Sequence, residues 1–257
     1  MTVIGVSCPD FGKIPFDKCI EDIAKDFRHW EIFSEAEHAV QNIAGEVAEL
    51  GQSYGMTFTV HSSIADTDAA AVNSRMREAA CMEFMSEMEA AVSFGAECIT
   101  IHPGIINLSV KGIRDRSIEA AKNTMRVLDR AQAEYGLPVA IENMPNFDIM
   151  LGIQAKELQE IVAGTDLGIC LDIGHANTSG QLDPMIKTFK DRIINVHIHD
   201  NHGKSDEHLT LGDGNIDFPK VLKKMSFYKG RYIIESKSLE SAVKSQEVLR
   251  DLISKAF

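Results

Sequence analysis

The sequence lacks the features that mark several classes of protein. Its five cysteines are an odd number and no two are spaced as CxxC, so neither a disulfide framework nor a cysteine zinc site is expected. No apolar run approaches the roughly 18–20 residues that span a bilayer. The first residues, Met1–Ser7, lack a basic region and are too short for a signal sequence. These absences predict a cytoplasmic protein with reduced thiols and no membrane partner.

Basic charge is also scarce. The chain has 26 Lys and Arg against 38 Asp and Glu, a net charge of −12, which opposes general attraction to nucleic acid. No GxGxxG follows the first apolar segment, which weakens a dinucleotide-binding fold. No linker or low-complexity stretch interrupts the 257 residues. We therefore expect one domain over residues 1–257, close to the ~250 residues typical of a (β/α)8 barrel.

Short β-branched runs alternate with segments of helical period, which predicts an α/β protein with a parallel sheet. Eight strands are predicted, so the closed (β/α)8 TIM barrel is favoured over an open sheet. The strands are expected at Thr2–Ser7, Trp30–Ser34, Thr57–Ser62, Cys98–His102, Pro138–Asn143, Gly168–Ile173, Ile193–His199 and Arg231–Ser236. The clearest helices are expected at Glu37–Gln52, Thr67–Phe94, Arg116–Tyr135 and Leu239–Ala256, and Asp217 is expected to cap a further helix.

Ligand-type residues stand where the predicted strands end, at the mouth where barrel enzymes hold their active sites. Glu142, Asp172 and Glu235 each follow apolar strand residues and should converge there. Three buried carboxylates repel one another unless a cation lies between them. The pattern predicts a divalent metal, with His197 as a nitrogen ligand.

The motifs at these strand ends resemble the xylose isomerase-like barrel superfamily. It contains sugar and sugar-phosphate isomerases and epimerases, inosose-processing enzymes and endonuclease IV-type abasic-site nucleases. The resemblance covers the chain from His61 to Glu235. It rests on the order and spacing of IHPG at 101–104, IEN at 141–143, CLDIGHA at 170–176, VHIHD at 196–200 and HLTLGDGNID at 208–217.

The isomerase and epimerase members imply one divalent ion, Zn, Mn, Co or Mg, held by Glu142, Asp172, His197 and Glu235. The ion would hold a sugar or sugar phosphate and stabilise a developing enediolate. Glu142 and Glu235 would transfer protons on the two faces of the substrate. His175 would donate a hydrogen bond to a substrate oxygen.

The nuclease members imply three zinc ions, and the corresponding positions are filled here. Beyond the four residues above, the additional candidates for metal or substrate are His61, His102, His175, Asp206 and His208. A nuclease is therefore the alternative function. A cyclitol lyase or dehydratase and a catalytically silent metal-binding barrel are more distant alternatives.

Departures from the nuclease pattern favour the isomerase. The loop at 35–38, where the nucleases have a basic DNA-reading loop, is acidic, and Ile64 stands where they have an aromatic wedge. Lys111, Arg114 and Arg116 form the one basic loop and are candidates for binding a substrate phosphate. The arginine that sugar epimerases often have after the seventh strand is absent, which leaves the sugar open.

Three other histidines are interpreted without a metal role. His29 and His38 are expected at the surface, and His202 in a solvated loop. His197 and His199 are two apart in one predicted strand and should share a face, but only one of the two is needed as a ligand.

Overall fold

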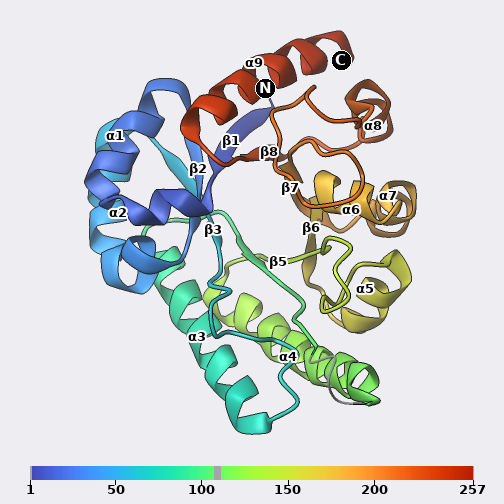
Figure 1. Cartoon of the computed structure of the whole chain (residues 1–257). Helices are drawn as coiled ribbons and strands as arrows, with labels where there is room; N and C mark the ends of the chain where they lie inside the picture. Colours follow the sequence, from blue (N-terminus) through green and yellow to red (C-terminus); the bar gives the residue numbers. More distant parts are fainter. Residues whose placement is uncertain (1, 107–110, 257) are drawn as a thin grey trace.

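Eight parallel strands close into a barrel in sequence order, with the helices around it (Figure 1). The computed structural model describes residues 2–106 and 111–256. The strands are β1 Val3–Ser7, β2 His29–Phe33, β3 Thr57–His61, β4 Ile99–Ile101, β5 Val139–Glu142, β6 Gly168–Asp172, β7 Ile193–Ile198 and β8 Arg231–Glu235. Pairing of β1 with β8 closes the barrel and sets Ser7 beside Glu235. The predicted (β/α)8 fold is confirmed.

Helices follow the strands around the outside of the barrel (Figure 1). The α-helices are α1 Phe16–Asp26, α2 Val40–Tyr54, α3 Ser74–Ser93, α4 Ile113–Tyr135, α5 Ala155–Ile161, α6 Ile173–Thr178, α7 Leu182–Phe189, α8 Phe218–Lys224 and α9 Leu239–Ala256. Two short 3-10 helices, Pro9–Lys13 and Ala36–His38, lie in the loops after β1 and β2. The last helix has its predicted bounds, and the side chain of Asp217 caps α8 as expected, by accepting a hydrogen bond from Lys220 N.

The predicted helix at 67–94 begins later than expected. Asn73 caps α3 by accepting from the backbone N–H of Arg75. The residues before it form a loop in which the Asp68 carboxylate accepts from Ala70 N at 2.9 Å and from Ile105 N at 3.0 Å. Because Asp68 links the loops after β3 and β4, this segment helps shape the mouth of the barrel instead of extending the helix.

The interior of the barrel is polar at mid-height. Strand residues alternate between the two faces of a sheet, so Trp30 and Ile32 pack toward the helices while Glu31 enters the barrel. Its carboxylate accepts from Thr59 Oγ1 and Asn195 Nδ2, each at 2.7 Å. Bulky branched residues usually fill such a layer. Here one carboxylate and its donors occupy it, directly beneath the strand ends.

The prediction that His29 and His38 lie at the surface is wrong, because both are buried. His29 lies inside the barrel, with Nδ1 2.7 Å from Thr57 Oγ1. His38 donates from Nε2 to the carbonyl of Ile14 at 2.9 Å and packs edge-on against Trp30. Both histidines are satisfied by partners distant in sequence. His202 is exposed in a loop as expected.

Within the described part of the chain, none of the helices is both long enough and apolar enough to cross a membrane.

Two glycines of α2 are expected to respond in opposite ways to alanine. A Cβ at buried Gly51 would lie 2.5 Å from Cε2 of Phe58, so Gly51→Ala should lower the free energy of unfolding by ~1–3 kcal/mol through overpacking. At Gly45 a Cβ meets nothing within 4 Å, so Gly45→Ala should raise it by ~0.5–1 kcal/mol. Urea unfolding of both variants measures this, and equal effects would contradict the packing of α2 on β3.

Burial of His29 should make the barrel less stable in mild acid. Burial lowers the pKa of His29 to about 4, from a usual value of 6.5. The contribution of the neutral ring to the free energy of unfolding is therefore fully present above pH 6.5. It decreases by ~1.4 kcal/mol per pH unit as the pH falls from 6.5 toward 4. Chemical unfolding of the wild type and His29→Gln between pH 7 and 4.5 tests it. The difference between the two proteins should change with pH, and a constant difference would refute the assignment.

Candidate functional site

Four residues predicted to share a metal ion converge at the carboxyl ends of the strands. Nδ1 of His197 lies 3.1 Å from Oε1 of Glu142, 3.1 Å from Oε1 of Glu235 and 3.9 Å from Oδ2 of Asp172. All four side chains are buried. We call these four residues the central group.

Glu31 sets the orientation of His197 from below. Its Oε1 lies 2.6 Å from His197 Nε2. Although burial favours a neutral acid, the neighbouring His197 lowers the pKa of Glu31 to about 2, so the carboxylate can only accept. Nε2 of His197 must then carry the donated proton, which leaves the lone pair of Nδ1 directed at the central carboxylates. Such carboxylate–histidine pairs are typical of metal ligands.

A second group of donors lies on the β3 and β4 side of Glu142. Nε2 of His61 and Nε2 of His102 lie 3.3 and 3.2 Å from Oε2 of the same carboxylate. Nδ1 of His61 donates to the carbonyl of Ser62 at 2.8 Å, so its Nε2 also presents a lone pair. Glu142 therefore uses one oxygen toward the central group and the other toward this pair.

A third group lies on the other side of the mouth. Oδ2 of Asp206 is 3.3 Å from Nε2 of His175 and 3.0 Å from Nε2 of His208. Nδ1 of His175 donates to the carbonyl of Asn143 at 2.9 Å, and this again leaves Nε2 free to bind a cation. His102, Asp206 and His208 are the partly exposed members of the three groups, with side chains about one-fifth exposed.

Asn143 and the helix after β6 position Asp172. The Asn143 amide extends the pairing of β5 with β6, because it donates to the carbonyl of Asp172 and accepts from its N–H, each at 2.9 Å. Oδ1 of Asp172 then accepts from His175 N at 2.5 Å and caps α6. The spacing of three between Asp172 and His175 is thus a helix cap that holds both side chains at the mouth.

One carboxylate organises the loop that supplies Asp206 and His208. Asp200, at the end of β7, accepts hydrogen bonds from four backbone N–H groups at 2.9–3.2 Å, those of Asn201, Gly212, Gly214 and Ile216. A Cβ at Gly214 would lie 2.3 Å from Oδ1 of Asp200, so this glycine is required for the close approach. His208 has a φ of +46°, a strained conformation for a residue other than glycine.

The charges of the site favour ionised carboxylates. Burial alone would raise the pKa of Glu142, but the surrounding imidazoles of His197, His102 and His175 hold it well below its usual value. The pKa of Asp206 is likewise held low by His175 and His208 against the effect of burial. Anionic oxygens surrounded by imidazole nitrogens are donors that suit Zn²⁺ and similar divalent ions.

The donors fit a cation better than they fit one another. Oδ2 of Asp172 is buried without a hydrogen-bond partner. Three imidazoles have one nitrogen occupied by a protein acceptor and the other directed at carboxylate oxygens 3.1–3.3 Å away. Although burial acts the other way, neighbouring anionic groups raise the pKa of His61, His175 and His197, so these contacts become favourable when either a proton or a metal cation lies on the second ring nitrogen.

The basic residues predicted to bind phosphate lie on the loop before α4 and on its first turn. Arg114 pairs with Glu157, with its Nε and Nη2 3.0 and 2.6 Å from Oε1. Lys111 and Arg116 are exposed. Their role in phosphate binding stays a prediction, and Arg114 has a protein partner that would compete with a phosphate.

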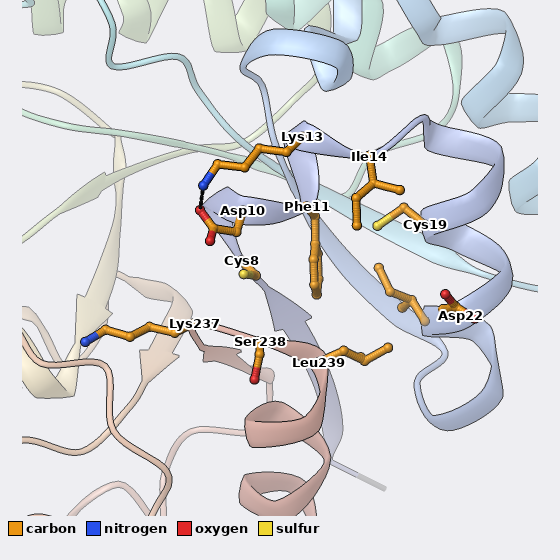
Figure 2. A pocket seen from close by; sticks show the side chains of 11 residues that line it. Cys8, Asp10, Phe11, Lys13, Ile14, Cys19, Asp22, Lys237, Ser238 and Leu239 are labelled. Carbon is orange, nitrogen blue, oxygen red and sulfur yellow. Dashed lines mark hydrogen bonds and ion pairs between the residues drawn. The ribbon is translucent and has the colours of Figure 1, made fainter.

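A cavity opens beside the mouth, between the end of β1, the start of α1 and the segment after β8 (Figure 2). Its volume is about 390 Å³. Phe11, Cys19 and Leu239 line it, and Lys237 stands at its edge (Figure 2). Glu235 of the central group precedes Lys237 by two residues and pairs in register with Ser7, but the residues that line the cavity include none of the three groups.

Two residues of the site escaped the sequence prediction. Glu31 gives the same signal as Glu142, a carboxylate within an apolar strand, but it lies in the middle of β2 and not at its end. His199 was considered dispensable beside His197. It is fully buried, and its Nε2 lies 3.3 Å from both Oδ1 of Asp172 and Oδ1 of Asp206.

Comparison with known proteins agrees with this architecture. The chain is 35% identical over 260 residues to the uncharacterized protein MJ1311 of Methanocaldococcus jannaschii, covering 97% of this chain and 88% of that protein. A solved structure described as a D-tagatose 3-epimerase-like protein superposes with a TM-score of 0.93 at 33% identity, covering 99% and 98% of the two chains. "Probable endonuclease 4" of Aquifex aeolicus is 28% identical over 194 residues, 65% of this chain and 66% of that protein.

The family model for the xylose isomerase-like TIM barrel matches residues 9–252. The match includes β2–β8 and all three groups of donors. The sequence-based assignment to this superfamily is therefore confirmed, and the chain belongs to the xylose isomerase-like TIM barrel family.

Proposed function

We propose that the protein is a divalent-metal-dependent isomerase or epimerase of sugars or sugar phosphates. The observation on which this rests is the central group, where carboxylates from opposite walls of the barrel, Glu142 on β5 and Glu235 on β8, face one imidazole nitrogen at 3.1 Å each. Glu142, Asp172, His197 and Glu235 would hold the ion. When bound, it would act as a Lewis acid on a substrate carbonyl and its neighbouring hydroxyl.

The two glutamates are suited to exchange a proton with a carbon between them. An ionised Glu142 removes a proton from the carbon next to the carbonyl, and Glu235, on the far wall, returns one to the other face; for an isomerase the proton returns to the neighbouring carbon. Nδ1 of His175 donates to the carbonyl of Asn143 and its Nε2 faces Asp206, so a hydrogen bond from His175 to a substrate oxygen requires a protonated ring and no ion on Nε2. Each such acid–base role contributes ~10²–10⁴-fold in rate.

The shape of the mouth supports a small substrate. The loop after β2 is a single turn of 3-10 helix, and Glu35 Oε1 binds it to the loop after β3 by accepting from Ile64 N and Ala65 N at 2.7 Å each. This rim is short and acidic, which disfavours a DNA backbone.

Phosphodiester hydrolysis is a second candidate, favoured by one observation. The three groups place His61 and His102 on one side of the central group and His175, Asp206 and His208 on the other. Separate groups of this kind would suit several ions acting on the attacking and leaving oxygens of a phosphodiester.

Proton transfer at carbon should be visible without knowing the product. We expect the metal-loaded protein to exchange a C–H hydrogen of a ketose or ketose phosphate with D₂O, as followed by NMR over a panel of sugars. Glu142→Gln and Glu235→Gln should each slow exchange by ~10²–10⁴-fold.

Glu97→Gln is the matched control, since Glu97 pairs with Arg231 outside the three groups; it should leave exchange unchanged. Cleavage of an abasic duplex with no exchange into any sugar would overturn the proposal in favour of the second candidate.

Glu31 should govern metal affinity although it is not among the proposed ligands. Glu31→Gln weakens the acceptor of the His197 Nε2 proton, and loss of such a partner lowers metal affinity by ~10–100-fold. Competition with a chromophoric chelator measures the change. Glu87→Gln is the control. Glu87 is as deeply buried as Glu31, but its carboxylate accepts hydrogen bonds from the Ser62 hydroxyl and the Ser63 N–H instead of from a histidine. Equal affinities for the Glu31→Gln and wild-type proteins would contradict the role of Glu31.

A further inference from the structure

The ring of His199 is fully buried and packs between His208 and Gly174. His199 follows β7 with no exposed surface, and the ring stacks on that of His208 at 4.1 Å between centroids and 8° between planes. A Cβ at Gly174 would lie 2.0 Å from Cε1 of this ring. The glycine of the DIGH motif is therefore required for His199 to reach the mouth.

The free nitrogen of His199 faces two carboxylates. Nδ1 lies 3.4 Å from the carbonyl of Asp200, and because a carbonyl only accepts, Nδ1 carries the proton of the neutral ring. The lone pair of Nε2 then points between Oδ1 of Asp172 and Oδ1 of Asp206, each 3.3 Å away.

Two buried atoms that face each other here lack a hydrogen-bond partner within the described residues: Nε2 of His199 and Oδ1 of Asp206. Unsatisfied buried polar atoms are uncommon, and each calls for a ligand, a water or an ion. One is an imidazole nitrogen and the other a carboxylate oxygen, so a cation is an occupant that satisfies both.

We propose that His199 is a fourth protein ligand of an ion held by the third group, with His175, Asp206 and His208. It lies outside the nine positions that the family resemblance implied. Around a tetrahedral Zn²⁺ with bonds of ~2.0–2.1 Å, neighbouring donor atoms are about 3.3 Å apart. Oδ2 of Asp206 lies 3.3 Å from Nε2 of His175 and 3.0 Å from Nε2 of His208, and its Oδ1 lies 3.3 Å from Nε2 of His199.

A fourth protein ligand changes what the ion does. Catalytic zinc sites keep one position open for water or substrate, whereas sites with four protein ligands are closed and structural. The ion of the third group is therefore tightly retained and fixes the loop at 201–216 over the mouth. The central group, with a different ligand set, remains the place where substrate binds. This inference does not depend on the proposed isomerase activity, but a closed third site leaves that ion no open position for a phosphodiester oxygen.

Replacing His199 tests the assignment by metal content alone. Purified apo-protein is loaded with zinc, dialysed against a chelator series and analysed for zinc per chain. His199→Asn should lose one ion that the wild type retains, or bind it at least ~100-fold more weakly. Loss of a residue that only hydrogen-bonds a metal ligand lowers metal affinity by up to ~100-fold, so loss of a ligand should lower it at least as much. His202→Asn, the exposed loop histidine paired with Glu207, should match the wild type.

An unchanged zinc content and affinity in His199→Asn would overturn the proposal. Should circular dichroism show that this variant does not fold, anomalous diffraction from the zinc-loaded wild type decides: an ion ~2.1 Å from Nε2 of His199 supports it, and a third-group ion bound without His199, or no ion there, overturns it. Because zinc content does not depend on turnover, failure here is distinguishable from failure of the proposed isomerase activity.

Discussion

The hydrogen bond between Glu31 and His197, deep inside the barrel, determines the character of the site above it. A fully buried carboxylate is costly unless it is compensated, and here Thr59, Asn195 and His197 all donate to it. This cluster takes the place of the apolar layer that usually fills such barrels. Because the Glu31 carboxylate accepts the N–H of His197 Nε2, the other ring nitrogen, Nδ1, faces the central carboxylates in a fixed orientation.

The same arrangement recurs in the other two groups. His61 and His175 each donate one ring N–H to a backbone carbonyl and direct the second nitrogen at a carboxylate. The protein therefore fixes the orientation of each ring through its own backbone, before any ligand arrives. Such preorganisation is what a site needs if binding energy is not to be spent on ordering its side chains.

The fold and much of the site were predictable because they depend on local patterns. Alternation of strand and helix signals located all eight strands, and carboxylates at strand ends located Glu142, Asp172 and Glu235. Short helices such as α5 and α7 have only about two turns, too few residues for a periodic pattern to stand out in the sequence. Burial of His38 depends on Trp30 and on the Ile14 carbonyl, and the position of His199 beside Asp206 depends on the folding of a long loop; neither contact leaves a trace in the sequence. Glu31 lies in the middle of β2, and the strand-end pattern that indicates the other carboxylates does not include it.

The Asp200 carboxylate accepts hydrogen bonds from four backbone N–H groups. It marks the boundary between the strand ends, which supply the central group, and the loop that supplies Asp206 and His208. The segment from Asn201 to Ile216 is held to the barrel by this side chain and by the pairing of Asp200 with Leu209, and hydrogen bonds to Asn177 and Ser245 add to these contacts. Insertions or exchanges within that stretch can therefore alter or remove Asp206 and His208 while the strands keep the central group intact. The loop supplies Asp206 and His208 whereas the strand ends supply the central group, so the two sets of donors depend on different parts of the fold.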